Sequence, residues 1–266
     1  MTEHRNPVRR RRLLAGLSLV LAGALPAAQA ATDPQALLAA SDAIRNPSKP
    51  FKVTVTLTEF DKGLQVNTTT LISFARTLEA GGQFASIIRF VQPLRDAGKL
   101  MLRNGSDLWF YDPGTKAAVR ISPQQRLLGQ ASNGDVVTVN FARDYKATLA
   151  AEEEIKDGER KTRQSLKLQL TAASPDATYG AIELWVDAAT QSPLKARFFA
   201  ESGRLLKTAF YRRLQNQLGM DRPTETVIID GVDPQSVTLV RLSDYGWRNA
   251  PVNWFQRDHL PNFNAD

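Results

Sequence analysis

The stretch Gly105-Ser106-Asp107-Leu108-Trp109-Phe110-Tyr111-Asp112-Pro113 decides the fold. The residues from Leu108 to Tyr111 are large and apolar or aromatic, and turn signals flank them at residues 104–105 and 112–114, so the stretch predicts one short strand. Side chains alternate across a strand, which places Leu108 and Phe110 on one face and Trp109 and Tyr111 on the other. Because both faces are apolar, we expect this strand inside a curved sheet that is covered on each side, by core or by a bound apolar molecule.

The same two-residue periodicity runs through most of the chain. Apolar and polar residues alternate from Phe51 to Thr58, and residues 162–170 repeat the pattern with leucines on one face. Turns rich in Gly, Asp and Asn join such segments in succession, which predicts an antiparallel meander. About 11 strands are more than one flat sheet holds comfortably, so we expect a mainly β (α+β) fold whose antiparallel sheet curls toward a barrel.

A short amphipathic helix is predicted before the first strand. Asp33-Pro34 provides an N-cap followed by a proline in the first turn, and Asn46-Pro47 ends the helical pattern. Between them, Leu37, Leu38 and Ile44 recur at near-helical spacing. We expect this helix either to plug one end of the sheet or to form a cap that moves when a ligand enters.

The strand pattern breaks at residues 123–134. This segment carries Leu127 and Leu128 among polar residues and glycines, and it is too long for a hairpin turn. We expect a short helix and a loop over the mouth of the sheet, either as a packed surface loop anchored by leucine or as a mobile lid. A further strand is predicted at Val136 to Phe141.

The first thirty residues have the pattern of a cleaved secretory signal peptide. A basic run, Arg9 to Arg12, precedes an apolar run, Leu13 to Leu25, and the small-residue site Ala28-Gln29-Ala30. A membrane-spanning helix needs about 20 apolar residues, and this run is shorter; an uncleaved anchor is the alternative. We therefore expect residues 31–266 to form a single domain in the periplasm of a Gram-negative cell, without disulfides because the sequence has no cysteine.

Charge argues against nucleic acid as a partner. The chain has 34 Lys and Arg against 27 Asp and Glu, of which residues 1–30 hold five arginines and one glutamate, leaving 29 against 26. This small excess is not gathered into a basic stripe with stacking aromatics.

Catalytic and metal-binding patterns are scarce. Outside residues 1–30 there is one histidine, His259, and no Gly-x-Ser-x-Gly elbow, so a serine hydrolase is not indicated. The run Glu152-Glu153-Glu154 alternates between the faces of a strand and does not have metal-ligand spacing. We expect no catalytic residue, metal or cofactor, although a carboxylate pair of the glycosidase type has no spacing signature and stays open.

Aromatic residues gather in the C-terminal segment, at Trp247, Trp254, Phe255 and Phe263. We expect this segment to pack across the sheet as a short helix or an extended tail. Docking to a membrane or a partner is the alternative.

The aromatic strand also carries a resemblance to a known family. Its motif, Gly-x-x-Leu-Trp-Phe-Tyr-Asp-Pro, resembles the signature strand of LolA-like periplasmic carriers, the outer-membrane lipoprotein-sorting superfamily. Arg120-Ile121-Ser122-Pro123, Arg126, Gly129 and Asp144-Tyr145 extend the resemblance, which spans about residues 50–245. It implies an incomplete, half-open β-barrel that is capped by short helices and encloses a hydrophobic cavity for acyl chains.

The resemblance implies a non-enzymatic carrier of a lipid, of lipoprotein acyl chains or of another hydrophobic molecule. The branch that the chain resembles most is associated with membrane exporters of the resistance-nodulation-division type, which implies an inner-membrane transporter as one partner and an outer-membrane acceptor as the other. A lipid sensor that regulates a membrane partner, and an enzyme acting on an envelope lipid or glycan, are the alternatives. The oligomeric state stays open, with a monomer expected.

Candidate ligand-binding residues follow from alternation and from the resemblance. One face of the aromatic strand should line the cavity, and the choice between the two faces stays open. The candidate wall residues are Val53, Val55, Leu57, Ile88, Phe90, Leu108, Trp109, Phe110 and Tyr111, and the candidate lid residues are Leu37, Leu38, Ile44, Leu127 and Leu128.

Overall fold

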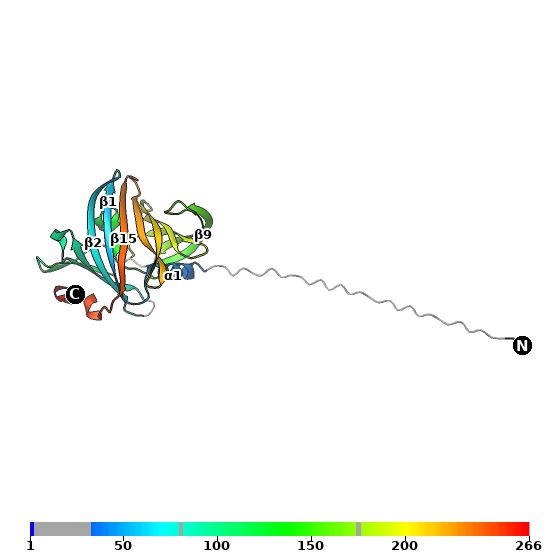
Figure 1. Cartoon of the computed structure of the whole chain (residues 1–266), viewed down its shortest axis with the longest axis horizontal. Coiled ribbons are helices and arrows are strands. Elements are labelled where there is room, and N and C mark those ends of the chain that lie inside the picture. The colour runs from blue at the N-terminus through cyan, green and yellow to red at the C-terminus, as the bar shows by residue number, and fades with distance from the viewer. Residues whose placement is uncertain (3–32, 80–81, 174–176, 266) are drawn as a thin grey trace. The chain divides into compact units, whose positions relative to one another are not determined.

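The computed structural model describes residues 1–2, 33–79, 82–173 and 177–265, so the predicted signal peptide lies outside the described residues except for Met1 and Thr2. Among the described residues, 13 strands form one antiparallel sheet in the order β6-β5-β4-β3-β2-β1-β15-β14-β13-β12-β11-β10-β9 (Figure 1). Strand β1 pairs with β15 and so joins two meanders. The strands are β1 (Phe51–Asp61), β2 (Leu64–Thr77), β3 (Phe84–Gln92), β4 (Leu100–Asn104), β5 (Asp107–Asp112), β6 (Ala117–Arg120), β9 (Tyr145–Lys156), β10 (Thr162–Ala172), β11 (Ala181–Asp187), β12 (Pro193–Phe199), β13 (Leu205–Gln217), β14 (Met220–Asp230) and β15 (Ser236–Trp247).

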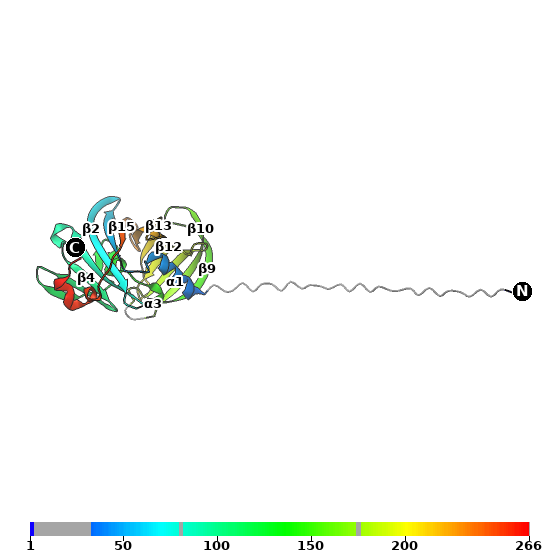
Figure 2. The ribbon, with the colours of Figure 1, turned by 60° about the horizontal axis from the view of Figure 1, so that its bottom comes forward.

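The sheet curls but does not close. Its edge strands are β6 and β9, which lie at opposite ends of the strand order. Figures 1 and 2 show the curved arrangement of the strands from β2 through β15 to β9. The predicted mainly β fold with a half-open antiparallel barrel is therefore confirmed, with 13 strands in the sheet among the described residues instead of about 11.

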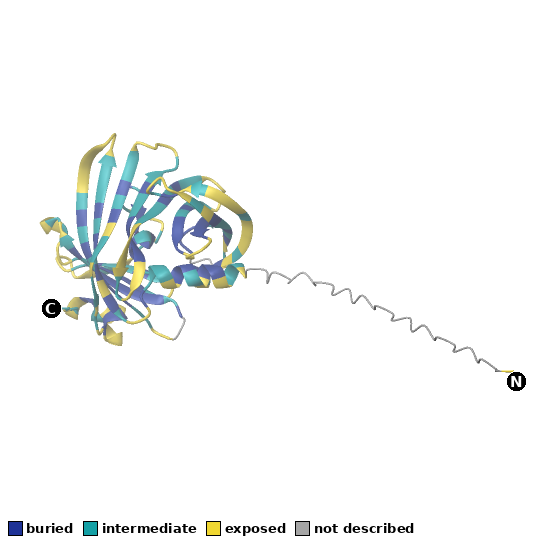
Figure 3. Cartoon of the chain, turned by 45° about the vertical axis from the view of Figure 1, so that its right-hand side comes forward, coloured by how far each residue is buried: buried dark blue, intermediate teal, exposed yellow. Residues whose placement is uncertain are grey.

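The inner face of the sheet carries the main hydrophobic core. In β1, Val53, Val55 and Leu57 are buried while the residues between them are half-buried. Figure 3 shows buried positions alternating with less buried ones along several strands. Leu168 and Leu170 of β10 and Ile182 and Leu184 of β11 extend the same core. Fully burying such a side chain stabilises the fold by about 1.5–3 kcal/mol. This is why the two-residue periodicity holds each strand in one register.

Helix α1 (Pro34–Arg45) precedes the sheet, as predicted. The Asp33 carboxylate accepts a hydrogen bond from the Gln35 N–H at 2.9 Å, and Pro34 occupies the first turn. The helix packs against β9, β14 and α3 (Phe141–Asp144), and Figure 2 shows it across one end of the β9–β13 region. Helix α1 therefore covers one end of the curved sheet.

The segment between β6 and β9 differs from the prediction in two places. Strands β7 (Arg126–Leu128) and β8 (Ala131–Ser132) form a hairpin where a short helix was expected, and helix α2 (Asn133–Val136) follows directly. Gly129 turns this hairpin with φ of +52°, and a Cβ there would lie 2.2 Å from Thr238 Oγ1. The tight turn therefore requires glycine.

The strand predicted at residues 136–141 does not form. Val136 ends α2, residues 137–140 have no regular structure, and Phe141 begins α3. Val137, Val139 and Phe141 are all buried and the residues between them are half-buried, so burial alternates along this stretch as in a strand. It arises because this stretch packs one side onto the inner face of the sheet, while its Asn140 N–H bonds to Gln83 Oε1 at 2.7 Å and not to a neighbouring strand.

The C-terminal segment packs across the outer face of β2 to β5, as expected. The 3-10 helices η2 (Val252–Phe255) and η3 (Arg257–Asn262) contribute Trp254, Phe255 and Leu260 to a second core; the remaining 3-10 helix, η1 (Leu94–Asp96), follows β3. The rings of Phe74 and Trp254 meet edge to face with centroids 5.4 Å apart. Both faces of this half of the sheet are thus covered.

Candidate ligand-binding cavity

A cavity of about 150 Å³ lies between the inner face of the sheet and the segment that crosses it. We call residues 131–144, from β8 to α3, the cover segment. The sheet side of the cavity is mostly apolar and includes Phe51, Val53, Val55, Phe198, Ala209, Ile228, Val240 and Leu242. The cover segment adds Val136, Val137, Val139 and Phe141. Most of the side chains that line the cavity from these two sides are therefore apolar.

The predicted wall residues divide into three groups: those at the cavity, those elsewhere on the inner face, and those on the outer face. Val53 and Val55 line the cavity. Five others lie in or against the main core of the inner face but not at the cavity: Leu57, Ile88, Phe90, Leu108 and Phe110. Over β3 to β5 the inner face is filled by its own side chains, for example the Phe90 and Phe110 rings, whose centroids are 5.9 Å apart. Their part in ligand binding stays a prediction.

Trp109 and Tyr111 lie on the other face. Both belong to the second core, and the guanidinium of Arg257 lies 4.3 Å from the Trp109 ring centroid. Of the two faces left open by the sequence, the one with Leu108 and Phe110 points inward, because the C-terminal segment covers the other.

The predicted lid residues are packed. Leu37 and Leu38 are 3% and 0% exposed, Leu128 is buried, and Ile44 and Leu127 are half-buried. They lie in α1, which contacts α3 of the cover segment, and in the β7–β8 hairpin, which leads into that segment. Their role as a movable lid stays a prediction.

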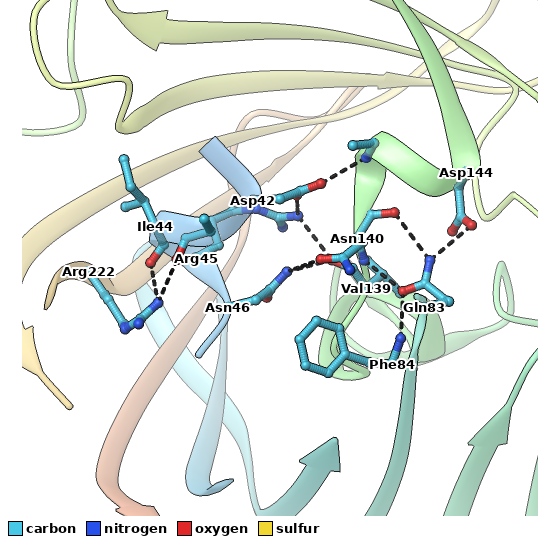
Figure 4. A network of polar contacts seen from close by, with 12 residues as sticks. Asp42, Ile44, Arg45, Asn46, Gln83, Phe84, Val139, Asn140, Asp144 and Arg222 are labelled. Carbon is cyan, nitrogen blue, oxygen red and sulfur yellow. Dashed lines mark hydrogen bonds and ion pairs between the residues drawn. The ribbon is translucent and has the colours of Figure 1, made fainter. Parts of the chain in front are cut away.

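A polar network ties α1 to the cover segment (Figure 4). Arg45 pairs with Asp42 and donates to the Val139 carbonyl at 3.2 Å, and Asp42 accepts from the Ala142 N–H at 2.8 Å. The Arg45 guanidinium lies 4.0 Å from the Phe141 ring centroid. Burial raises the pKa of Asp42, and the Arg45 charge opposes this shift.

Two further sets of contacts tie the C-terminal end of α1 to the cover segment and to β14. The Asn46 amide donates to the Val139 carbonyl at 2.8 Å. From β14, Arg222 Nη1 donates to the carbonyls of Ala43 and Ile44 at 3.1 and 2.6 Å, so a cation satisfies the last carbonyls of α1 (Figure 4). The helix, the sheet and the cover segment are thereby connected at one end of the cavity.

A second buried network holds the start of the cover segment. Lys207 of β13, which is 4% exposed, pairs with Asp135 of α2 and donates to the Gln130 carbonyl at 3.2 Å. Asp135 also accepts from the Tyr179 hydroxyl at 2.7 Å and from the Ser132 N–H at 2.7 Å, the latter as the capping box of α2. Burial raises the pKa of Tyr179 well above its usual value, so this hydroxyl stays a donor.

The sequence carries signals for some of these residues. Lys207 shares a strand face with Ala209 and Tyr211, so its charge falls on the inward face, where an apolar residue is the rule. Ser132-Asn133-Gly134-Asp135 has capping-box spacing. Arg45 had no such signal, because an arginine at a helix C-terminus is usually explained by the helix dipole.

The described residues contain no cluster of metal ligands and no long apolar helix. None of their His, Asp and Glu side chains form a group of three that could hold a metal ion. Within the same part of the chain, no helix has the length and apolarity to cross a membrane.

Comparison with known proteins gives the family. A family model described only as that of an uncharacterized protein matches residues 82–262, and no curated protein matches significantly. The fold is similar to a DUF1329 family protein from Desulfovibrio piger (21% identity, 86% of this chain and 100% of that chain, TM-score 0.72). It is also similar to a domain from Vibrio parahaemolyticus assigned to outer membrane lipoprotein sorting (18%, 86% and 98%, TM-score 0.71).

A LolA superfamily protein from Nitrosomonas europaea is similar in sequence as well as in fold. It is 32% identical, and the alignment covers 86% of this chain and 100% of that chain with a TM-score of 0.77. Together with the half-open barrel and the motif of β5, this similarity shows that the chain belongs to the LolA superfamily.

Proposed function

We propose that this chain is a non-enzymatic carrier that binds a lipid, or the acyl chains of a lipid-modified protein, between the sheet and the cover segment. The observation that supports this most is the largely apolar cavity on the inner face, which is covered by a segment that is hydrogen-bonded to the sheet through side chains. Such contacts can break without dismantling the sheet.

The size of the cavity sets a condition on binding. A volume of about 150 Å³ suits a molecule the size of benzene. An acyl chain is larger, so we expect the cover segment to move when such a chain enters. A chain of about 14 methylenes would gain roughly 11 kcal/mol in gross terms, at about 0.8 kcal/mol for each buried methylene. Removing a buried charge from its partner costs about 3–5 kcal/mol. The free energy gained by burying the ligand is larger, so it can offset the cost of breaking the ion pair when the cover segment opens.

We further propose that the carrier works in the periplasm. The export pattern of residues 1–30 supports this setting, with residues 31–266 as the exported domain. A carrier there would take its cargo from an inner-membrane partner, such as an exporter of the resistance-nodulation-division type, and deliver it to the outer membrane. The similarity to a domain assigned to outer membrane lipoprotein sorting is compatible with this route.

Native mass spectrometry with organic extraction tests the proposal. The full chain is expressed in a Gram-negative host and recovered from the periplasm without detergent. We expect a stoichiometric lipid on the wild type and none on Ala209→Phe, which fills the cavity from β13. Thr208→Phe, on the outer face of the same strand, is the matched control and should keep the lipid.

An empty wild-type protein would contradict the proposal. If the wild type is recovered empty and does not enhance the fluorescence of bis-ANS, the cavity does not bind apolar ligands. Loss of lipid from both variants would point to a general packing defect.

A further inference from the structure

We propose that the cavity recognises the acyl carbonyl end of its ligand, a carboxylate or an ester, through Arg45, Tyr211, Tyr245 and Ser73. This inference rests on the proposed carrier function and names the class of lipid that fits it. The shared chemistry is a hydrogen-bond-accepting oxygen at the end of an alkyl chain.

Arg45 presents unused donors to the cavity. It lines the cavity, and its side chain is 16% exposed. The hydrogen bonds that it donates to Asp42 and Val139 both leave from Nη2, so they use neither Nε nor Nη1. Guanidinium donors that face an apolar space without an acceptor are unfavourable. A ligand oxygen would satisfy them.

Three hydroxyls add to this set of donors. Tyr211 of β13, Tyr245 of β15 and Ser73 of β2 all line the cavity. Among the described residues, the buried Ser73 hydroxyl has no hydrogen-bond partner. Ser73 is 1% exposed, and its neighbour across the sheet is Val53, itself a wall residue. Ser73 is therefore a buried polar group at the cavity wall whose partner is missing.

The tyrosines stay protonated and can donate. Burial raises the pKa of Tyr245 to about 12, and burial also raises the pKa of Tyr211, against the opposing charge of Arg45. The ring of Tyr245 stacks on Phe51 with centroids 6.4 Å apart, which holds its position.

The cavity offers hydrogen-bond donors to a ligand but no carboxylate that is free to pair with one. Among the described residues that line it, the one carboxylate is Asp135, whose oxygens already accept from Ser132, Tyr179 and Lys207. A ligand that brings acceptor oxygens therefore fits, whereas a cationic head finds no free partner. Because Asp42 balances the charge of Arg45, the site suits a neutral ester as well as an acid.

Three fluorescent probes separate recognition of a carboxylate, recognition of an ester and binding of an apolar molecule without acceptor oxygens. Parinaric acid carries a carboxylate, its methyl ester carries only the ester oxygens, and diphenylhexatriene carries no acceptor oxygen. We expect Arg45→Met to weaken binding of the acid about tenfold or more, and Tyr211→Phe to weaken it several-fold. Tyr211→Phe should bind diphenylhexatriene as tightly as the wild type. Because Arg45→Met also removes a contact to the cover segment, its effect is measured as the ratio of the affinities for the acid and for diphenylhexatriene. Tyr111→Phe, in the second core, is the matched control and should change nothing.

The outcomes distinguish the two proposals. A loss for the acid alone assigns the site to a carboxylate, and equal losses for acid and ester assign it to an acyl carbonyl; both support the inference. If Arg45→Met does not fold, Tyr211→Phe still decides, since it removes one hydroxyl and keeps the ring. Unchanged affinities, or equal losses for diphenylhexatriene, overturn the acyl-end site alone. A wild type that binds none of the three probes overturns the carrier function as well.

Discussion

Replacing Lys207 with methionine tests whether the buried charge pair holds the cover segment on the sheet. The variant keeps an apolar stem but removes the ammonium, which pairs with Asp135, donates to the Gln130 carbonyl and lies 4.9 Å from the Tyr179 ring centroid. Removing one partner of a buried pair costs about 3–5 kcal/mol, because the other charge stays in a low-dielectric interior. Asp135 keeps the hydrogen bonds from Ser132 and Tyr179, so we expect the lower end, about 3 kcal/mol.

Urea and thermal unfolding of the full chain measure this loss. About 3 kcal/mol corresponds to a fall in Tm of roughly 6–12 °C for a domain of this size. The double variant Lys207→Met with Asp135→Leu removes both charges, and we expect it to recover more than about 1 kcal/mol relative to the sum of the single variants. Lys195→Met is the control: this lysine also lies over an aromatic ring, 4.7 Å from the Trp185 centroid, but on the outer face, and should cost less than about 1 kcal/mol.

Two results would refute the reasoning. One is a loss below about 1 kcal/mol in Lys207→Met. The other is a double variant whose loss equals the sum of the single losses, since the two residues would then act independently. In addition, Lys207→Met should take up diphenylhexatriene faster than the wild type; equal uptake rates would show that the ligand does not enter past this end of the cover segment.

Three further predictions concern stability. Leu57→Ala should lower the free energy of unfolding by about 2–5 kcal/mol because Leu57 is 0% exposed, whereas Thr56→Ala on the outer face should change it by less than about 0.5 kcal/mol in urea unfolding. Gly129→Ala should lower Tm, since its Cβ would lie 2.2 Å from Thr238 Oγ1 at a φ of +52°; an unchanged Tm would contradict the turn geometry.

The last of the three concerns pH. Burial tends to raise the pKa of Asp157, but its hydrogen bonds with Arg163 and nearby N–H groups lower it overall. This carboxylate therefore stabilises the fold above its unfolded pKa of about 3.9 and loses that contribution as pH falls through the lower folded pKa. Asp157→Asn should be less stable than the wild type at neutral pH, with the gap closing below about pH 4 in urea unfolding; a gap independent of pH would contradict the shift.

Most of the sheet could be predicted from the sequence, whereas the cover segment could not. In β1 the alternation of Val53, Val55 and Leu57 reports burial against one face, which is also the physical cause of the strand. Val137 and Val139 alternate in the same way, yet they pack onto the sheet without pairing with a strand. Periodicity reports which side of a segment is buried, and it does not report whether the backbone finds a strand partner.

The position of the cavity likewise depends on distant elements. Leu108 and Phe110 face inward because η2 and η3, more than a hundred residues later in the chain, cover Trp109 and Tyr111. The cavity itself lies over β1, β2 and β12 to β15 because side chains such as Phe90 fill the inner face elsewhere.

The sequence by itself determined the fold class, the strands of the sheet, the first helix and the packed C-terminal segment, because local periodicity, turns and caps act over a few residues. Only the tertiary structure decided which wall residues meet at the cavity and which charges pair across it. Arg45, Asp135 and Lys207 are far apart in sequence, and the free energy that places each of them comes from partners that only the folded chain brings into contact.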